Sequence, residues 1–260
     1  MTDAQKELKA LLDAKHDLYN RPDFIENDPI SIPHRFSKKE DIEIAGFLAA
    51  LMAWGKRSMI MKSASRLMEM MDNAPFEFVL GANETSLQKV DAFVHRTLNS
   101  LDMKALLQSL QTVYQKEGGL ENIFSSAISS SEKTVWAGIV HAREKLGNQA
   151  HFPQRTYKHL SNPAENSAAK RINMFLRWMV RQDKRGVDFG LWQSISPAQL
   201  ICPLDVHTGN VGRALGLLSR KYDDKKSADE LTDNLRLFCA EDPVKYDFAL
   251  FGLGVNGELL

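Results

Sequence analysis

The chain has 260 residues, with 33 basic and 33 acidic side chains, a formal net charge of zero and 43% apolar residues. This composition excludes an intrinsically disordered chain, which would combine low hydrophobicity with a high net charge, and it suffices for a sizeable core. The richest apolar stretch, residues 42–54, is shorter than the ~20 residues of a membrane-spanning helix. The first residues do not form a secretory signal. The two cysteines are too few for a disulfide framework. We therefore expect a cytoplasmic protein.

The charges are unevenly distributed along the chain. Residues 151–221 carry 11 Lys and Arg against 4 Asp and Glu, whereas residues 222–260 carry 4 against 9. A local basic surface favours a polyanionic partner, because only charges within a Debye length of ~8–10 Å act strongly on one another. The pattern equally fits a solvated helical face whose charge is balanced by its neighbours in space.

Apolar spacing predicts helices along the first half of the chain. We expect them over residues 8–20, 40–54 and 58–71, with more polar helices over 87–98, 103–115 and 134–145. Ser37 and Glu40 have the spacing of a capping box and predict the start of the second helix. Its core face is expected to consist of Ile44, Phe47, Leu48 and Leu51.

Prolines and polar residues predict a loop over 151–166. A helix is then expected to begin with Ser167 as its N-cap, and its core stripe is Ile172, Phe175, Leu176 and Met179. A short helical turn is expected over 196–200, and helices over 206–220, 227–238 and 243–255. Few segments alternate with a period of two, so the predicted fold is all-α.

Lys170 is a candidate nucleophile. If Ser167 caps the helix, Lys170 is its third residue, where the partial positive charge of a helix start disfavours a cation. Such a lysine either extends into solvent or loses its charge, and desolvation beside another cation, here Arg171, favours a neutral, nucleophilic amine. Arg177 and Arg181 follow about two and three turns later, off the predicted core stripe, where they would form a basic ridge for phosphates.

A second block surrounds Asp205. This aspartate is an N-cap candidate for the helix over 206–220, and capping alone would account for its presence. His207, Thr208 and the unpaired N–H groups of the helix start would offer a seat for a phosphate. Glycines at 209, 212 and 216 each cost a helix ~1 kcal/mol relative to alanine. We expect the close approach of another helix, or of a nucleic-acid backbone, to compensate.

These two blocks resemble helix-hairpin-helix DNA glycosylases, the superfamily of endonuclease III and the 8-oxoguanine glycosylases. The segment that resembles their catalytic-aspartate segment comprises Pro203-Leu204-Asp205-Val206-His207-Thr208, then Val211, Arg213 and Leu215-Gly216-Leu217. Lys170 matches the lysine nucleophile of the bifunctional members. Residues 45–60 resemble the helix and turn that reach the DNA lesion, and residues 242–255 resemble the closing helix. The gap of 35 residues between Lys170 and Asp205 resembles the archaeal 8-oxoguanine glycosylases. The whole chain also resembles a bacterial conserved family of unknown function.

The resemblance implies two helical subdomains with a cleft between them: residues 30–160 as a central subdomain, and residues 1–29 plus 161–260 as a terminal-helix subdomain carrying the site. It implies a base-excision repair glycosylase with AP-lyase activity that acts on an oxidised base in double-stranded DNA. We expect a monomer without cofactor, metal or membrane partner. Lys170 would be the nucleophile and Asp205 its assisting carboxylate.

The resemblance and the charges together give the remaining site residues. Expected phosphate contacts are Lys56, Arg57, Arg171, Arg177, Arg181, His207, Thr208 and Arg213. The residues expected to wedge into the base stack or line a base pocket are Trp54, Trp178 and Trp192, although core packing would also account for each tryptophan.

Two other interpretations fit the sequence. One is a non-catalytic nucleic-acid-binding relative of that fold. The other is a protein-interaction protein or an unrelated helical enzyme. A steep salt dependence of DNA affinity would separate the glycosylase and the nucleic-acid-binding relative from this last interpretation. Borohydride trapping of a Schiff base would separate an enzyme from a non-catalytic binder.

Overall fold

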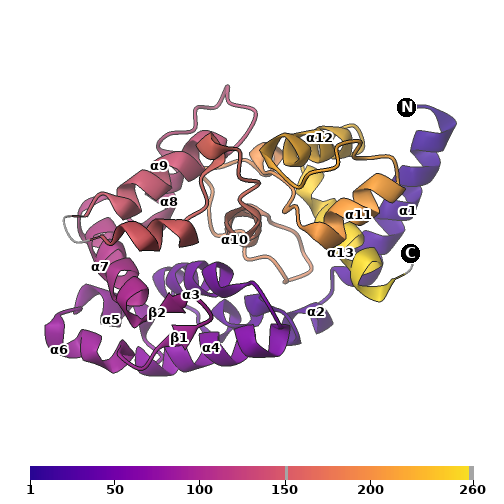
Figure 1. Ribbon diagram of the computed structural model, residues 1–260. Coiled ribbons are helices and arrows are strands. Elements are labelled where there is room, and N and C mark those ends of the chain that lie inside the picture. Colours follow the sequence, from indigo (N-terminus) through magenta and orange to yellow (C-terminus); the bar gives the residue numbers. More distant parts are fainter. Residues whose placement is uncertain (150–151, 258–260) are drawn as a thin grey trace. The chain divides into compact units, whose positions relative to one another are not determined.

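The computed structural model describes residues 1–149 and 152–257 and is mostly helical, with 63% of residues in helices and little strand (Figure 1). The helical content agrees with the all-α prediction. The chain divides into two compact units. The central unit consists of Ile25–Ser129 and Trp136–Ser161, and the terminal unit of Met1–Phe24, Ser130–Val135 and Asn162–Leu260. Residues 130–135, which the sequence assigns to the central subdomain, thus belong to the terminal unit. His151, the first residue of the predicted loop over 151–166, lies outside the described residues.

The central unit is built from short and medium-length helices. Its elements are η1 (Pro29–Ser31), η2 (Pro33–Arg35), α3 (Lys39–Met52), α4 (Arg57–Met70), α5 (Pro75–Leu80), α6 (Glu84–Leu87), η3 (Gln88–Val90), β1 (Val94–His95), β2 (Leu98–Asn99), α7 (Ser100–Lys116), α8 (Leu120–Ser125), α9 (Trp136–Gly147) and η4 (Gln154–His159), while α2 (Asp23–Glu26) crosses the boundary between the units.

Helix α3 is the core of the central unit. Every residue from Ile42 to Met52 is buried, so the helix is enclosed on all sides rather than along the single stripe expected from its sequence. The one charged residue in that run, Glu43, accepts a hydrogen bond of 2.7 Å from the hydroxyl of Tyr114. The predicted capping box is wrong, because the helix begins after Lys38 and Ser37 therefore lies outside its N-cap.

The helix predicted over 87–98 is wrong as well. The segment continues from α6 and η3 into an antiparallel hairpin of β1 and β2. Its turn contains Arg96 in a left-handed conformation, with φ of +55°. His95 beside the turn is buried and its Nδ1 lies 3.0 Å from the hydroxyl of Ser63 on α4. This contact across the fold fixes a hairpin that local apolar spacing does not indicate.

The terminal unit contains the helices of the predicted site. Its elements are α1 (Asp3–Tyr19), η5 (Pro163–Glu165), α10 (Lys170–Val180), η6 (Pro197–Gln199), α11 (Val206–Ala214), α12 (Lys225–Arg236), η7 (Pro243–Tyr246) and α13 (Asp247–Asn256). Helix α11 is shorter than the predicted helix over 206–220, because Gly216 just beyond it has a φ of +70° and ends it.

Helix α13 packs against α1 and α11, which lie far apart in the sequence (Figure 1). Small residues allow the close approach on both sides. A Cβ at Gly254 would lie 3.2 Å from the Cβ of His207, and one at Gly252 would lie 2.2 Å from the ring of Tyr19. The close approach of α13 to α11 thus depends on Gly254, whereas Cβ atoms at Gly209 and Gly212 would first meet Asp223 and Leu231 and not α13, so the predicted role of the α11 glycines does not explain this contact.

Gly252→Ala is expected to force α13 away from Tyr19 and to lower the free energy of unfolding by about 1–3 kcal/mol. Gly212→Ala in α11 is the matched control. A Cβ at Gly212 would meet Leu231 at 3.4 Å, an ordinary contact. This control should be neutral or stabilising, since alanine favours a helix over glycine by ~1 kcal/mol. Urea unfolding followed by circular dichroism measures both variants, and equal effects would contradict the close contact with Tyr19.

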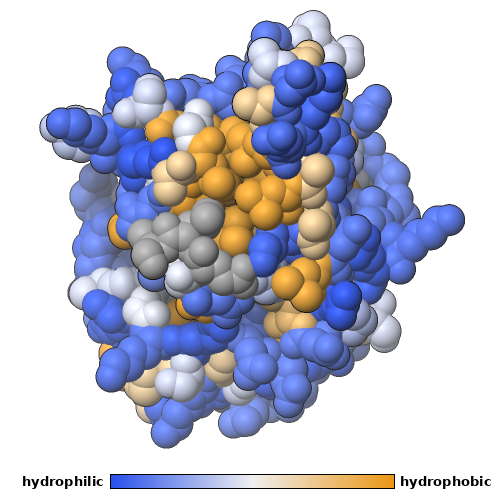
Figure 2. Space-filling model, turned by 90° about the vertical axis from the view of Figure 1, so that its right-hand side faces the viewer, coloured by the Kyte–Doolittle hydropathy of each residue, from blue (hydrophilic) through white to orange (hydrophobic). Residues whose placement is uncertain are grey.

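One surface of the terminal unit is rich in apolar side chains. Figure 2, which faces the side where α1 and α13 lie, shows apolar side chains gathered within a hydrophilic border. Exposed apolar residues of these two helices include Leu11, Leu18 and Val255. Such a surface offers phosphates no electrostatic attraction. Within residues 1–149 and 152–257, no helix has both the length and the apolar character to span a membrane.

Candidate active site

The structure places Lys170 at the first residue of α10. The predicted N-cap, Ser167, is wrong: the N-cap is Ala169, in a left-handed conformation with φ of +46°. The hydroxyl of Ser167 accepts a hydrogen bond from the backbone of Ala169 and its backbone pairs with Asp224, so the helix begins only after these residues. Lys170 therefore lies even closer to the helix start than predicted.

Asp205 is the N-cap of α11, as the sequence predicts. Its Oδ1 accepts hydrogen bonds of 3.0 Å from the backbone N–H groups of His207 and Thr208. Those two N–H groups are thus already used by the protein itself. The second carboxylate oxygen, Oδ2, takes no part in the cap.

The structure brings Lys170 and Asp205 together. Nζ of Lys170 lies 3.6 Å from Oδ2 of Asp205, and each side chain is 27% exposed. Sδ of Met174, one turn further along α10, lies 3.7 Å from the same Nζ. The pair combines an amine with a carboxylate that can accept its proton or stabilise a nearby positive charge, in a place that a ligand can reach.

Behind this pair lies a buried carboxylate that the sequence interpretation missed. Asp247, the first residue of α13, is 5% exposed and forms an ion pair with Arg177. Burial raises the pKa of Asp247 to about 6, while the nearby charges of Arg177 and Lys170 lower it and that of Asp205 raises it. Asp247 thus links the Lys170–Asp205 pair to the interior. A lone acid directly before the apolar run 248–253 is the signal that would have indicated it.

The basic ridge predicted from Arg177 and Arg181 is wrong. Their side chains are buried, at 4% and 2% exposure, and form ion pairs within the terminal unit. Both guanidinium groups also lie over the ring of Phe248, at 4.2 and 5.6 Å from its centroid. The two arginines therefore organise the interior and are not available to phosphates.

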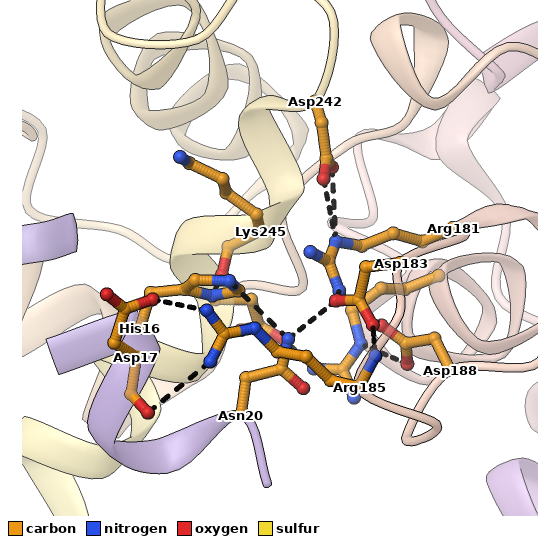
Figure 3. Close-up of polar contacts among 11 residues, drawn as sticks. His16, Asp17, Asn20, Arg181, Asp183, Arg185, Asp188, Asp242 and Lys245 are labelled. Carbon is orange, nitrogen blue, oxygen red and sulfur yellow. Dashed lines mark hydrogen bonds and ion pairs between the residues drawn. The ribbon is translucent and has the colours of Figure 1, made fainter. Parts of the chain in front are cut away.

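The aspartate partners of Arg181 come from the loop after α10 and from the residue before η7 (Figure 3). Nε of Arg177 and NH1 of Arg181 lie 3.2 and 3.0 Å from the two oxygens of Asp188. The further partners of Arg181 are Asp183 at 2.8 Å and Asp242 at 2.9 Å. Each buried guanidinium thus has carboxylate partners, which burial of an arginine requires.

The same network reaches α1 through His16 (Figure 3). Nδ1 of His16 lies 2.8 Å from the carbonyl oxygen of Lys245, so this nitrogen donates, and Asn20 bridges the ring to Asp183. Burial, together with the charge of Arg181, lowers the pKa of His16 to about 4. The folded protein therefore holds this histidine in its neutral form.

The pKa of His16 is lower in the folded state, about 4, than the ordinary value of 6.5 that applies to the unfolded chain. Its contribution to stability is therefore fully present at a pH above 6.5 and is lost as the pH falls toward 4. We expect the difference in unfolding free energy between the wild type and His16→Gln to shrink by about 2–3 kcal/mol between pH 7 and pH 4. The titration of Asp247 is common to both proteins and cancels. Urea unfolding at several pH values measures the difference, and parallel pH profiles would contradict the prediction.

The predicted aromatic residues separate into two groups. Trp178 and Trp192 are fully buried, at 0% and 1% exposure, and Trp192 packs edge-on against Phe175. The expectation that either stacks on an extruded base is therefore wrong, and both are core residues. Trp54 is partly exposed and belongs to the central unit, as do the exposed Lys56 and Arg57.

The other predicted phosphate contacts differ in their availability. Arg213 is held by the loop after α11, through the carbonyl oxygens of Arg220 and Lys221 and the carboxylate of Asp223. Thr208 is buried, so neither residue is free to bind a phosphate. His207 is exposed at the start of α11.

Arg171 is partly buried beside Lys170, and burial lowers its pKa. Of the phosphate contacts predicted in the terminal unit, Arg171 and His207 are thus the two whose side chains reach the surface near the Lys170–Asp205 pair. Among the described residues, no group of three or more His, Cys, Asp or Glu side chains is arranged to hold a metal ion.

Comparison with known proteins gives a family but no activity. A model of the family described as a protein of unknown function (DUF2400) matches residues 28–256 of the chain. No curated protein and no solved structure matches it.

Proposed function

The chain belongs to the DUF2400 family, and we propose from its own site that it is a DNA base-excision glycosylase with AP-lyase activity on an oxidised base. The observation that carries the proposal is the distance of 3.6 Å between Nζ of Lys170 and Oδ2 of Asp205 in a pair open to solvent. The proposal includes the finer fold assignment, a helix-hairpin-helix glycosylase-like arrangement of two subdomains.

The proposed reaction begins with a damaged base rotated out of the duplex, which costs a few kcal/mol. The neutral amine of Lys170 attacks C1′ of the sugar, and the base leaves with the electron pair of its bond to C1′ and takes up a proton. The nitrogen loses its proton and the C1′–O4′ bond opens, which leaves an imine between Lys170 and the sugar. Removal of a proton from C2′ then expels the 3′-phosphate and nicks the strand.

Asp205 has two tasks in this proposal, one for each carboxylate oxygen. Oδ1 holds the start of α11 through the N–H groups of residues 207 and 208, which fixes the carboxylate in place. Oδ2 faces the amine, where it accepts the proton of Lys170 or stabilises the positive charge that develops on the sugar.

The backbone before Lys170 also supports the proposal. Ala169 occupies the left-handed region that non-glycine residues avoid. Such strain costs of order 1–3 kcal/mol, persists only where the surroundings impose it, and is concentrated at functional sites. Here it fixes the position from which the Lys170 side chain leaves the chain.

A second candidate function is a nucleic-acid-binding protein without amine chemistry. The observation that favours it is that both groups of the pair also have a structural role, since Asp205 caps α11 and forms a salt bridge with Lys170. An ion pair favours the charged ammonium, which is not nucleophilic.

Borohydride trapping distinguishes the two functions. The purified protein is incubated with duplex DNA that carries 8-oxoguanine, an oxidised pyrimidine or an abasic site, and an imine is reduced to a stable adduct. We expect an adduct that peptide mass spectrometry locates at Lys170, and the preferred substrate identifies the lesion. No adduct on any of the three duplexes, together with salt-sensitive DNA binding, would overturn the enzymatic proposal in favour of the binding protein.

A further inference from the structure

The first part of helix α4 and the residues before it carry basic charges only, whereas the exposed Glu69 lies in the last turn of the helix, on the same side as Arg66. Residues 53–68 contain four basic residues and no Asp or Glu. The four, Lys56, Arg57, Lys62 and Arg66, are all exposed. Lys62 and Arg66 are four residues apart and so lie on the same side of the helix, where two like charges cost ~0.2–0.5 kcal/mol.

Two further arginines join α4 from other segments. Arg35, from η2, donates a hydrogen bond of 2.7 Å to the hydroxyl of Ser65. Arg96 is the left-handed turn residue of the β1–β2 hairpin, which lies beside α4 (Figure 1). We call this surface the α4 basic face and define it by six exposed residues: Arg35, Lys56, Arg57, Lys62, Arg66 and Arg96.

Contacts with neighbouring residues fix the position of the Arg96 side chain. Its guanidinium lies over the ring of Trp54, at 4.5 Å from the centroid. Gly55 leaves room for it, because a Cβ there would lie 2.6 Å from a guanidinium nitrogen of Arg96. The left-handed backbone of Arg96 stores strain of order 1–3 kcal/mol. The chain thus maintains a cation at the tip of the hairpin at an energetic cost.

Three of the six cations, Lys56, Lys62 and Arg66, differ from other lysines of the central unit in having no carboxylate partner in the part of the chain that the structure describes. Lys89 and Lys104 of the same unit are paired with Asp72 and Asp91. Uncompensated charges of one sign attract a polyanion and raise its rate of association.

We propose that the α4 basic face binds the phosphate backbone of double-stranded DNA. The ten residue steps from Lys56 to Arg66 span about 15 Å along the helix, which matches about four phosphates of one strand at ~3.4 Å per nucleotide. Within this span Lys62 and Arg66 lie on one side of the helix, about 6 Å apart along its axis, and two cations so placed fit a linear polyanion, whereas Arg57 projects from another side. A membrane surface would require apolar side chains to insert, and the exposed large apolar side chain of α4 is Met59. The choice of DNA rests on the function proposed for the Lys170–Asp205 pair.

Salt-dependent binding tests the inference on the full-length protein. Fluorescence anisotropy with an undamaged 20-base-pair DNA duplex between about 50 and 200 mM salt gives the affinity and the slope of log affinity against log salt. We expect Lys62→Glu and Arg66→Glu each to weaken binding roughly tenfold at the lowest salt and to reduce the slope by about one or more. Arg96→Ala should weaken binding in the same direction.

Lys116→Glu is the matched control. Lys116 is an exposed lysine of the same unit, at the last residue of α7 and about 24 Å along that helix from the hairpin that precedes it. Its replacement makes the same charge change, and we expect binding within twofold of the wild type. A loss as large as that of Lys62→Glu, unchanged binding in Lys62→Glu and Arg66→Glu, or tighter binding to an RNA duplex of the same sequence would each overturn the inference.

The measurement of salt-dependent DNA binding does not depend on formation of the borohydride adduct. Adduct formation by the wild type and the salt-dependent affinity of the α4 variants are measured separately, so each proposal has its own readout. Loss of the adduct with intact salt-sensitive binding contradicts the proposed enzyme and leaves the DNA-binding face standing. Formation of the adduct with no effect of the α4 variants contradicts the face alone.

Discussion

Replacement of Arg177 by methionine is expected to lower the free energy of unfolding by about 3–5 kcal/mol. Methionine keeps much of the side-chain volume but removes the charge that lies between Asp188 and Asp247. The loss comes mainly from the two carboxylates, which stay buried without their counter-charge. Burial already raises the pKa of Asp247 to about 6, so this carboxyl can take up a proton. The loss should therefore be smaller at pH 5 than at pH 8.

Arg185→Met is the control for the Arg177 prediction. Arg185 also pairs with an aspartate, Asp17, at 2.5 Å, but their side chains are 36% and 63% exposed. An exposed pair contributes ~0–1 kcal/mol, so the control should remain within that range. Urea unfolding monitored by circular dichroism compares the two, and Arg177→Met combined with Asp247→Asn should recover part of the loss. Equal, small losses for both arginines would show that the buried network does not stabilise the fold.

The sequence predicted the parts of the fold that depend on local spacing. The N-cap role of Asp205 was predictable because a capping residue acts on the two or three residues that follow it. The proximity of Lys170 and Asp205 was predictable only through the family resemblance, since 35 residues separate them. No pattern within α10 or α11 indicates that their starting residues meet.

The sequence could not predict the partners of Arg177 and Arg181. Amphipathic periodicity assumes one buried face, whereas α10 is buried on all sides from Ile172 to Val180. The arginines are accommodated because aspartates at 188, 242 and 247 neutralise them, and those residues lie up to 70 positions away in the sequence. The hairpin containing Arg96 was missed for the same reason, because a contact with α4 fixes it.

Replacement of Lys170 by glutamine is expected to abolish the borohydride adduct completely, because the amide has no nucleophilic nitrogen. Lys226→Gln, an exposed lysine of α12, is the control and should leave adduct formation unchanged. An adduct that persists in Lys170→Gln would assign the nucleophile to another amine. Stability should change little in either variant, since both side chains are at least partly in solvent.

Asp205→Asn tests whether the charge of this residue, rather than its cap, assists the amine. An asparagine oxygen still accepts the hydrogen bonds from residues 207 and 208, so α11 keeps its N-cap and the fold should be preserved. The amide can neither take the proton of Lys170 nor stabilise a positive charge on the sugar. We therefore expect adduct formation to slow by about 10²–10⁴-fold at unchanged DNA affinity. Asp205→Ala removes both roles, and a rate loss found only in that variant would reduce Asp205 to a structural cap.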